Sequence, residues 1–367
     1  MGFERDAAII ERIARTVDPA FLPVPEQVMQ AAIADMAARA EGDDRDSFLL
    51  SAMRLVALAD NAHSRVIPNA GFSVLPHRFV VRDARLCAVY EGTCVPVVSV
   101  NGVSVQDLLH AWDKFVPGPE ARQLVLAGLM LAWPAALALG CISGPTFEYR
   151  LENGRVLRSH IERCVPAHTQ YSENETGASV VGADAFPAPL VSRRGAVWHV
   201  RLDDLKRLSA DDVAGGVATL AKTPSGAVVD LRGNPGGSFL KALPLVQLLR
   251  DQGHGHRCAV LVNGYTFSAA IVVAVLIAHH LGDRAALFGA EMGDRLSFWA
   301  EGDLLDLPDS GAKLRYSMAW HDWRTGVPDP TTPAEIAAHL VAGGDLAVRG
   351  HPEAKQMEAA LSFVLEG

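Results

Sequence analysis

Apolar residues at helical spacing dominate the first part of the chain. Residues 1–58 have buried-type side chains every three to four positions, apart from a proline-rich break at residues 19–25. Ser47 follows a polar run and is placed to cap the last of these helices. The pattern predicts a helical N-terminal region.

Short apolar runs of strand length follow between residues 72 and 110. Two Asn-Gly pairs favour tight hairpin turns: Asn101-Gly102, and Asn153-Gly154 between strands predicted at 146–151 and 156–161. We therefore expect a module of antiparallel strands after the helices.

One uncharged segment, residues 124–142, approaches the length of a membrane span. Pro134 interrupts its middle, and Gly128 and Gly140 weaken it as a single helix. The segment predicts a buried helix pair or hairpin inside the protein rather than a membrane crossing.

From residue 196 onward, strand and helix patterns alternate, which is typical of a largely parallel sheet with crossover helices. The polar stretch before it, residues 166–189, is rich in Gly, Ser, Ala and Pro and predicts a linker or loop. The expected strands are 196–202, 227–230, 259–262 and 285–288, and the expected helices are 210–222, 239–249, 268–281, 333–341 and 352–365.

The strand at 227–230 ends in a turn that is rich in glycine, Gly233-Asn234-Pro235-Gly236-Gly237. A strand that stops at two glycines before a helix leaves backbone N–H groups free to stabilise an anion or a developing oxyanion. Gly236 and Gly237 are therefore candidate oxyanion donors.

A second strand-turn-helix places Ser268 between the turn at 263–267 and an apolar helix. Nucleophilic serines occupy such turns, with the helix dipole behind them. The backbone N–H of Ala269 would then be a further oxyanion donor. The alternative is that Ser268 is an ordinary helix N-cap.

Composition excludes several classes of function. The net charge is −9 and the pI is about 5.8, and there is no basic run, so neither nucleic acid nor an anionic membrane surface is expected as a partner. Five scattered cysteines lack metal-ligand spacing and predict reduced thiols of a cytoplasmic protein. The charged N-terminus does not have the pattern of a signal peptide. No cofactor and no metal are implied.

The two glycine and serine motifs together resemble the tail-specific (C-terminal processing) serine peptidases and the tricorn core protease. The resemblance rests on Asp-Leu-Arg-Gly-Asn-Pro-Gly-Gly at 230–237 and Gly-Tyr-Thr-Phe-Ser-Ala-Ala at 264–270, and it continues at 289–293 and 307–311. It covers most of residues 55–330. Either motif alone would be weak, whereas the pair is specific.

The resemblance implies an α/β protein, mixed α+β overall, with a ClpP/crotonase-like catalytic core, an N-terminal helical cap and a degenerate PDZ-like β module. The PDZ-like module is degenerate because the Gly-Leu-x-x-Gly-Asp stretch is missing. The implied domains are 1–70 (helical, ending at the His63 motif), 71–165 (PDZ-like module with apolar helices), 166–190 (linker), 191–330 (catalytic core) and 331–367 (C-terminal helices).

The resemblance also supplies the general base. In the tricorn-like branch a histidine motif follows the N-terminal helices, and His63-Ser64 matches that place. The processing peptidases instead use a lysine about twenty-five residues after the serine, but the first lysine after Ser268 is Lys313. We therefore expect His63 to act as the base, since histidine needs little pKa tuning near neutrality.

The acid that orients the base has three candidates. Asp322 precedes a Gly-Val-Pro-Asp stretch like the one that follows the family's glutamate, while Asp60 and Glu291 are rivals. Ile271 departs from the glutamate that the family often has after Ser-Ala-Ala, and the 289–294 loop departs from its usual Gly-Glu-Pro-Thr-Gly-Gly.

These residues predict a serine peptidase that hydrolyses peptides through an acyl-enzyme. Ser268, His63 and Asp322 would be catalytic, and Gly236, Gly237 and Ala269 would hold the oxyanion. One alternative is a crotonase-like acyl-CoA hydrolase or hydratase, which would not need Ser268. The other is a binding protein that keeps the fold without activity. Homo-oligomerisation is compatible with the sequence.

Overall fold

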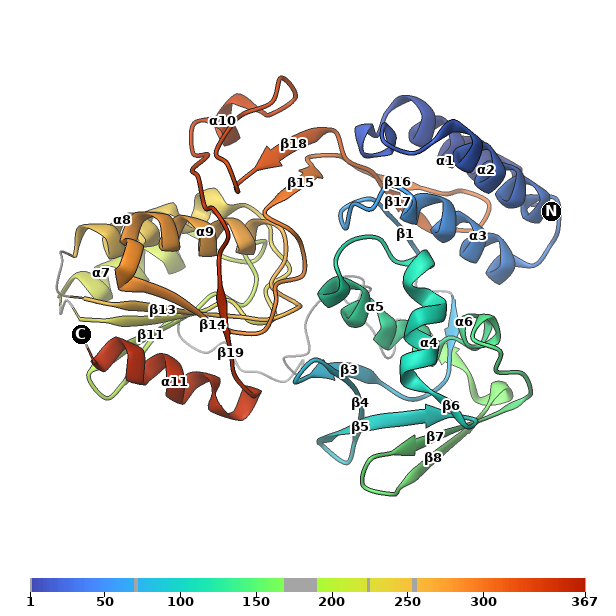
Figure 1. Ribbon diagram of the computed structural model, residues 1–367, viewed down its shortest axis with the longest axis horizontal. Helices are drawn as coiled ribbons and strands as arrows, with labels where there is room; N and C mark the ends of the chain where they lie inside the picture. Colours follow the sequence, from blue (N-terminus) through green and yellow to red (C-terminus); the bar gives the residue numbers. More distant parts are fainter. Residues whose placement is uncertain (1, 69–71, 168–189, 223–224, 253–255, 367) are drawn as a thin grey trace. The chain divides into compact units, whose positions relative to one another are not determined.

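The chain forms two compact units in the computed structural model, which describes residues 2–68, 72–167, 190–222, 225–252 and 256–366. Unit 1 comprises Met1–Thr176 and Phe298–Trp320, and unit 2 comprises Gly177–Ser297 and His321–Gly367 (Figure 1). Both units combine helices with sheets, so the predicted mixed α/β class is confirmed. Most of the linker predicted at 166–190 lies outside the described residues.

Unit 1 begins with the predicted helices, α1 (Glu4–Thr16), α2 (Glu26–Ala40) and α3 (Arg45–Ala57). The cap of α3 differs from the prediction. Asp44 is the N-cap, and its carboxylate accepts hydrogen bonds from the Ser47 N–H at 3.2 Å and from the Ser47 hydroxyl at 2.6 Å. The N-cap therefore lies three residues before Ser47 and the helix begins at Arg45, because an aspartate caps as well as a serine does.

An antiparallel sheet follows in the order β3-β4-β5-β7-β8, with β6 paired to β5. Both predicted Asn-Gly turns connect neighbouring strands, and Asn101 and Gly102 have positive φ angles of 47° and 85°. The strands are β3 (Phe79–Arg82), β4 (Arg85–Tyr90), β5 (Thr93–Val100), β6 (Val103–Ser104), β7 (Thr146–Leu151) and β8 (Val156–His160), with a separate pair of β2 (Ser73–Val74) and β9 (Val165–Pro166).

The uncharged segment at 124–142 is a buried helix pair, as predicted. After α4 (Val105–Trp112), helix α5 (Glu120–Ala132) ends at Trp133, and Pro134 begins α6 (Pro134–Leu139). No helix in the described part of the chain is long and apolar enough to span a membrane.

After residues 177–297 of unit 2, the chain returns to unit 1 at residues 298–320. Strand β17 (Lys313–Arg315) lies between β1 (Arg65–Ile67) and β16 (Leu304–Asp306) in a three-stranded sheet. The sequence places these residues inside a continuous 191–330 core. The difference arises because β17 pairs with β1, about 250 positions earlier, a long-range contact that leaves no local pattern.

Unit 2 contains a six-stranded sheet in the order β10-β11-β12-β13-β14-β19. Neighbouring strands from β11 to β19 are parallel, and only β10 runs antiparallel to its neighbour. The predicted parallel sheet is therefore confirmed. Its strands are β10 (Val191–Arg194), β11 (Val197–Arg201), β12 (Ala227–Asp230), β13 (Cys258–Val262), β14 (Ala285–Gly289) and β19 (Val348–Gly350).

Helices cover both faces of this sheet (Figure 1). On one face lie α7 (Ala210–Lys222), α8 (Leu243–Asp251) and α9 (Ala269–Leu281), and on the other α11 (Glu353–Leu365) packs Phe363 and Val364 against β12–β14. Strand β13 is buried at all five positions, as a central parallel strand should be.

Three elements near the ends of predicted segments differ from expectation. The helix predicted at 239–249 begins as a 3₁₀ turn (Phe239–Ala242), and the one predicted at 333–341 shortens to α10 (Ala334–Ala337). The edge strand β19 was not predicted, because three residues are too few to show a period. Strands β15 (Ser297–Ala300) and β18 (Ala319–Asp322) pair where the chain passes between the units.

Candidate active site

Ser268 occupies a strained turn between β13 and α9. Its backbone angles, φ 55° and ψ −127°, are those of the first central position of a type II′ turn, which normally requires glycine. The turn is closed by a hydrogen bond from Ala270 N–H to Phe267 C=O at 3.1 Å. This is the conformation that lifts a nucleophilic side chain out of a strand-to-helix turn.

The side chain of Ser268 does not act as a helix cap. An N-cap serine normally has extended backbone angles and accepts a hydrogen bond from the second or third helical N–H. Ser268 has neither feature. By contrast, Ser104 caps α4 from an extended conformation and accepts the Asp107 N–H at 3.1 Å. The ordinary N-cap interpretation of Ser268 therefore fails on geometry.

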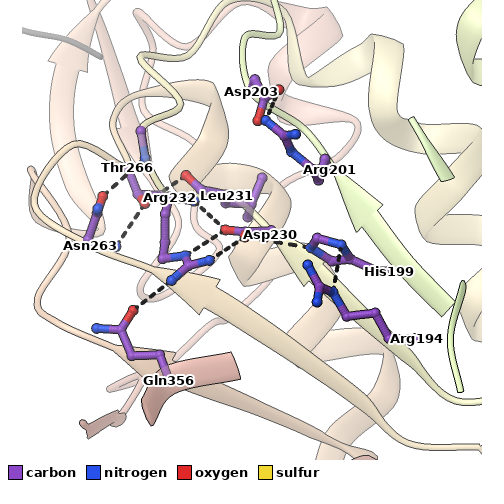
Figure 2. A network of polar contacts seen from close by, with 11 residues as sticks. Arg194, His199, Arg201, Asp203, Asp230, Leu231, Arg232, Asn263, Thr266 and Gln356 are labelled. Atoms are coloured by element: carbon purple, nitrogen blue, oxygen red, sulfur yellow. Dashed lines mark hydrogen bonds and ion pairs between the residues drawn. The ribbon is translucent and has the colours of Figure 1, made fainter. Parts of the chain in front are cut away.

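The turn that carries Ser268 is fastened to the glycine-rich turn after β12. The buried Thr266 hydroxyl donates to Leu231 C=O at 2.9 Å, and Phe267 N–H donates to Asn234 C=O at 3.0 Å. The Asn263 side-chain oxygen accepts the Gly233 N–H at 3.2 Å. These bonds fix one turn against the other, and Figure 2 shows Asn263, Thr266 and Leu231 in this arrangement.

Gly236 lies against the Cβ of Ser268. A Cβ added to Gly236 would stand 2.7 Å from that atom and 2.9 Å from Phe267 C=O, and φ at Gly236 is +97°. Both the space and the backbone conformation therefore exclude other residues. The following Gly237 has φ +136°, and a Cβ there would meet the backbone at Leu205 and Lys206.

The N–H groups of the two glycines have different roles. Gly236 N–H donates to the Asn234 side-chain oxygen at 2.8 Å, so it is engaged within the turn. Within the described ranges, no hydrogen bond engages the N–H of Gly237 or of Ala269. Of the three predicted oxyanion donors, these two are therefore available.

Asn234 is the residue that sequence reasoning left without a role. Its side chain is fully buried, donates to Leu202 C=O at 2.7 Å and accepts the Gly236 N–H. It therefore sets the conformation of the glycine turn. Its place inside the Gly-Asn-Pro-Gly-Gly motif was the available signal.

A half-buried ion pair anchors the end of β12 just before this turn (Figure 2). Arg232 donates to Asp230 from Nη2 at 2.6 Å and from Nε at 2.9 Å, and its Nη1 donates to Gln356 at 3.1 Å. His199 Nε2 lies 3.6 Å from Asp230, beyond hydrogen-bond distance. Burial would raise the pKa of Asp230, but Arg232 and the nearby His199 lower it to about 2. The pairing of Asp230 with Arg232 is structural.

His63 is held in unit 1, in the loop between α3 and β1. Its ring is 2% exposed and stacks on Phe298, with ring centroids 4.9 Å apart and an interplanar angle of 17°. The neighbouring Ser64 hydroxyl donates to the buried Asp18 carboxylate at 2.6 Å, and the same oxygen of Asp18 accepts Ser317 N–H at 3.1 Å. This network fixes the loop on both sides.

The three candidate acids differ in their surroundings. Asp322 accepts hydrogen bonds from the Ser297 hydroxyl at 2.8 Å, the Thr325 hydroxyl at 2.7 Å and the backbone of its own turn. Burial raises its pKa, but these bonds outweigh burial and lower it. Glu291 is exposed, and Asp60 has a positive φ of 45°. The contacts give Asp322 a structural role in its turn.

The structure thus gathers Ser268, Gly236, Gly237 and Ala269 in unit 2, and it describes His63 within unit 1. The described residues contain no group of three or more His, Cys, Asp or Glu side chains placed to hold a metal ion.

Comparisons with known proteins extend this description. No protein-family model and no curated protein sequence matches the chain. Among solved structures, mature CPAF is similar with a TM-score of 0.57 and 14% identity, over 86% of this chain and 88% of that one. Mature CPAF complexed with lactacystin gives a TM-score of 0.55 and 13% identity, over 86% and 89%. A photosystem II D1 C-terminal processing protease gives 0.44 and 15%, over 88% and 89%. The chain therefore shares the fold of mature CPAF over most of its length.

Proposed function

We propose that this protein is a serine peptidase, with Ser268 as the nucleophile. The observation that carries the proposal is the type II′ turn at Ser268. A non-glycine residue persists in so unfavourable a conformation only where the surrounding structure enforces it, and such residues cluster at functional sites. An inert helix cap would have no need of it.

The reaction follows from the groups in unit 2. Ser268 Oγ attacks the carbonyl carbon of a peptide bond, and the carbonyl oxygen, now negative, accepts hydrogen bonds from the N–H groups of Gly237 and Ala269. Collapse of this intermediate releases the amine and leaves an acyl-enzyme, which water then hydrolyses. Losing one such donor typically slows a reaction by about 100- to 1,000-fold.

The general base is proposed from the family resemblance. His63 would take the proton of Ser268 and return it to the leaving amine. Its ring stacks on Phe298 and the neighbouring Ser64 bonds Asp18, contacts that would hold a base in one orientation. The orienting acid remains a prediction among Asp322, Asp60 and Glu291. The hydrogen bonds of Asp322 favour a structural role for it over a catalytic one.

The wider resemblance adds finer proposals. We infer a tail-specific, tricorn-like enzyme acting on peptides. Unit 2 would be its ClpP/crotonase-like core, α1–α3 its helical cap and the β3–β8 sheet its PDZ-like module. Helices on both faces of a parallel sheet support the first assignment, and the antiparallel order supports the last. Five free cysteines favour a reducing, cytoplasmic setting. Assembly into a homo-oligomer is compatible with these features.

Labelling with a fluorophosphonate probe tests the nucleophile. We expect the wild type to be labelled at Ser268, the Ser268→Ala variant to remain unlabelled, and the His63→Ala variant to label far more slowly. Ser104→Ala is the matched control, because it removes a serine from a helix N-cap that is conventional in geometry.

The same assay separates the rival functions. Wild-type protein that is folded by circular dichroism and yet unlabelled would refute the peptidase proposal and favour a binding protein. Hydrolysis of acyl-CoA that persists in Ser268→Ala would favour the crotonase-like alternative. Cleavage of a fluorogenic peptide by wild type and not by Ser268→Ala would support the peptidase over both.

A further inference from the structure

A small cavity in unit 1 serves none of the roles assigned above. It lies between α3, β1, the segment after the 3₁₀ turn Asp113–Phe115, and α5. Eleven residues line it, and ten of them are apolar, among them Val56, Phe115, Leu126 and Met130. The eleventh is Arg65, which is therefore the only charged residue among the described residues of the lining.

The guanidinium of Arg65 has hydrogen-bond capacity that the described part of the chain does not fill. Its Nε and Nη1 are both buried, and neither has a hydrogen-bond partner there. A buried donor of this kind is costly, more so when it carries charge. In most proteins a carboxylate, a carbonyl or an ion would satisfy it.

The charges around Arg65 increase this cost. Arg315 faces it directly in the register of β1 and β17, and Arg122 of α5 is 1% exposed. Burial is the main cause that lowers the pKa of Arg65, and repulsion from Arg122 and Arg315 adds to it. Like charges opposite one another on paired strands destabilise a sheet. An anion at Arg65 would offset both the burial and the repulsion.

We propose that this cavity binds the carboxylate of a small apolar acid, with the carboxylate on Arg65 and the hydrocarbon part against the apolar walls. A phosphate or sulfate would bring two or more charges and a strongly held hydration shell into a cavity that offers one charged side chain among ten apolar ones. A carboxylate matches one guanidinium in charge, and its substituent matches the walls.

The size of the cavity limits the ligand. Its volume is about 30 Å³. Because about 10–15 Å³ suffices for one water molecule, the cavity has room for about two water-sized groups. A carboxyl group alone would fill most of it, which leaves room for only a short hydrocarbon part. We therefore expect short acids to bind best, with little gain from chains longer than the cavity mouth.

Calorimetric titration of the full-length protein with sodium acetate, butyrate and hexanoate tests the proposal, with sodium chloride at equal ionic strength and butyramide as controls. We expect butyrate to bind and butyramide not to bind. A dipeptide that ends in leucine, compared with its C-terminal amide, distinguishes a free acid from a chain end as the source of the carboxylate. Binding by neither source, or equal binding by chloride, would overturn the proposal.

The Arg65→Met variant tests the residue. Its affinity for butyrate should fall by about 10- to 100-fold, the worth of a charged hydrogen bond. Without ligand it should melt at a higher temperature than wild type, since two buried N–H groups without partners in the described part of the chain have been replaced by an apolar chain. Arg54→Met, which changes an exposed arginine of α3, should alter neither quantity. A lower melting temperature for ligand-free Arg65→Met would show that the chain itself satisfies Arg65, and the proposal would fail.

Discussion

Replacing Ser268 by glycine should make the protein more stable while abolishing its reactivity. The backbone at Ser268 has φ 55° and ψ −127°, a region that glycine enters freely and other residues do not. A residue held in such a conformation costs about 1–3 kcal/mol. Glycine removes that cost, and alanine, which keeps the Cβ, does not.

The expected magnitude follows from two opposing terms. Glycine relieves the strain of about 1–3 kcal/mol, but its greater freedom in the unfolded chain costs about 0.4–1 kcal/mol. The Ser268→Gly variant should therefore be more stable than Ser268→Ala by roughly 0.5–2 kcal/mol. No cap hydrogen bond is lost in either variant, because the Ser268 side chain makes none in the structure.

Ser104 provides the control for helix capping. Its hydroxyl caps α4 from ordinary extended angles, so both Ser104→Ala and Ser104→Gly should destabilise the protein, alanine by about 1 kcal/mol and glycine by a few tenths. Of the two glycine variants, only Ser268→Gly should thus be more stable than the wild-type protein. Urea unfolding, monitored by hydrogen exchange of the α9 and α4 amides, measures the effect of the Ser268 variants in unit 2 and of the Ser104 variants in unit 1.

The result that would refute the reasoning is equal stability of Ser268→Gly and Ser268→Ala. The turn at Ser268 would then be unstrained in solution, and the argument from conformation to nucleophile would lose its basis. Labelling should be absent in both variants in any case, since neither retains a hydroxyl.

Three further predictions concern the residues that support the site. Asn234→Ala should lower the unfolding free energy by about 2–4 kcal/mol, because it leaves two buried backbone groups unpaired. It should also slow fluorophosphonate labelling, because the glycine turn is disturbed. Unchanged labelling would show that Asn234 supports stability but not the reactivity of Ser268. Asp230 has a folded pKa of about 2, below the 3.8 of an unperturbed group, so its pairing with Arg232 stabilises the protein above pH 4 and is lost as pH falls from about 4 to 2. Asp230→Asn should remove about 2 kcal/mol of that pH dependence, measured by urea titrations at pH 2.5 and 5. Asp322→Asn should lower stability by about 1–2 kcal/mol and labelling by less than about tenfold; a loss of labelling beyond about 100-fold in folded protein would instead make Asp322 the orienting acid.

The sequence predicted the elements of unit 2 because its signals are local. Each signal can be recognised within a dozen residues: a buried valine-rich strand, a turn with two glycines, and a serine before an apolar helix. The type II′ conformation of Ser268 could not be predicted in this way, since it depends on Gly236 packing against its Cβ and on the bond from Phe267 to Asn234. Serine has no local preference for such angles.

The surroundings of His63 were beyond the sequence for a different reason. Asp18, Phe298 and Ser317 fix its loop, and they come from positions 45 residues before it and about 250 after it. The return of residues 298–320 to unit 1 leaves no periodic trace, so the predicted domain boundaries did not anticipate it. A single sequence shows the histidine motif but not the partners that hold it.

The two halves of the proposed machinery therefore differ in how they tolerate substitution. In unit 2 the proposed oxyanion donors are backbone groups set by glycine conformation and by Asn234. Departures from the family pattern such as Ile271, a fully buried residue in the first turn of α9, can serve packing without touching those donors. His63 instead depends on side chains, because Asp18 and Ser64 hold its loop and Phe298 holds its ring. Loss of activity should accordingly be common among substitutions in the His63 network. Around the glycine turn it should be confined to the two glycines and to the side chains that fix the turn, which are Asn234, Asn263 and Thr266.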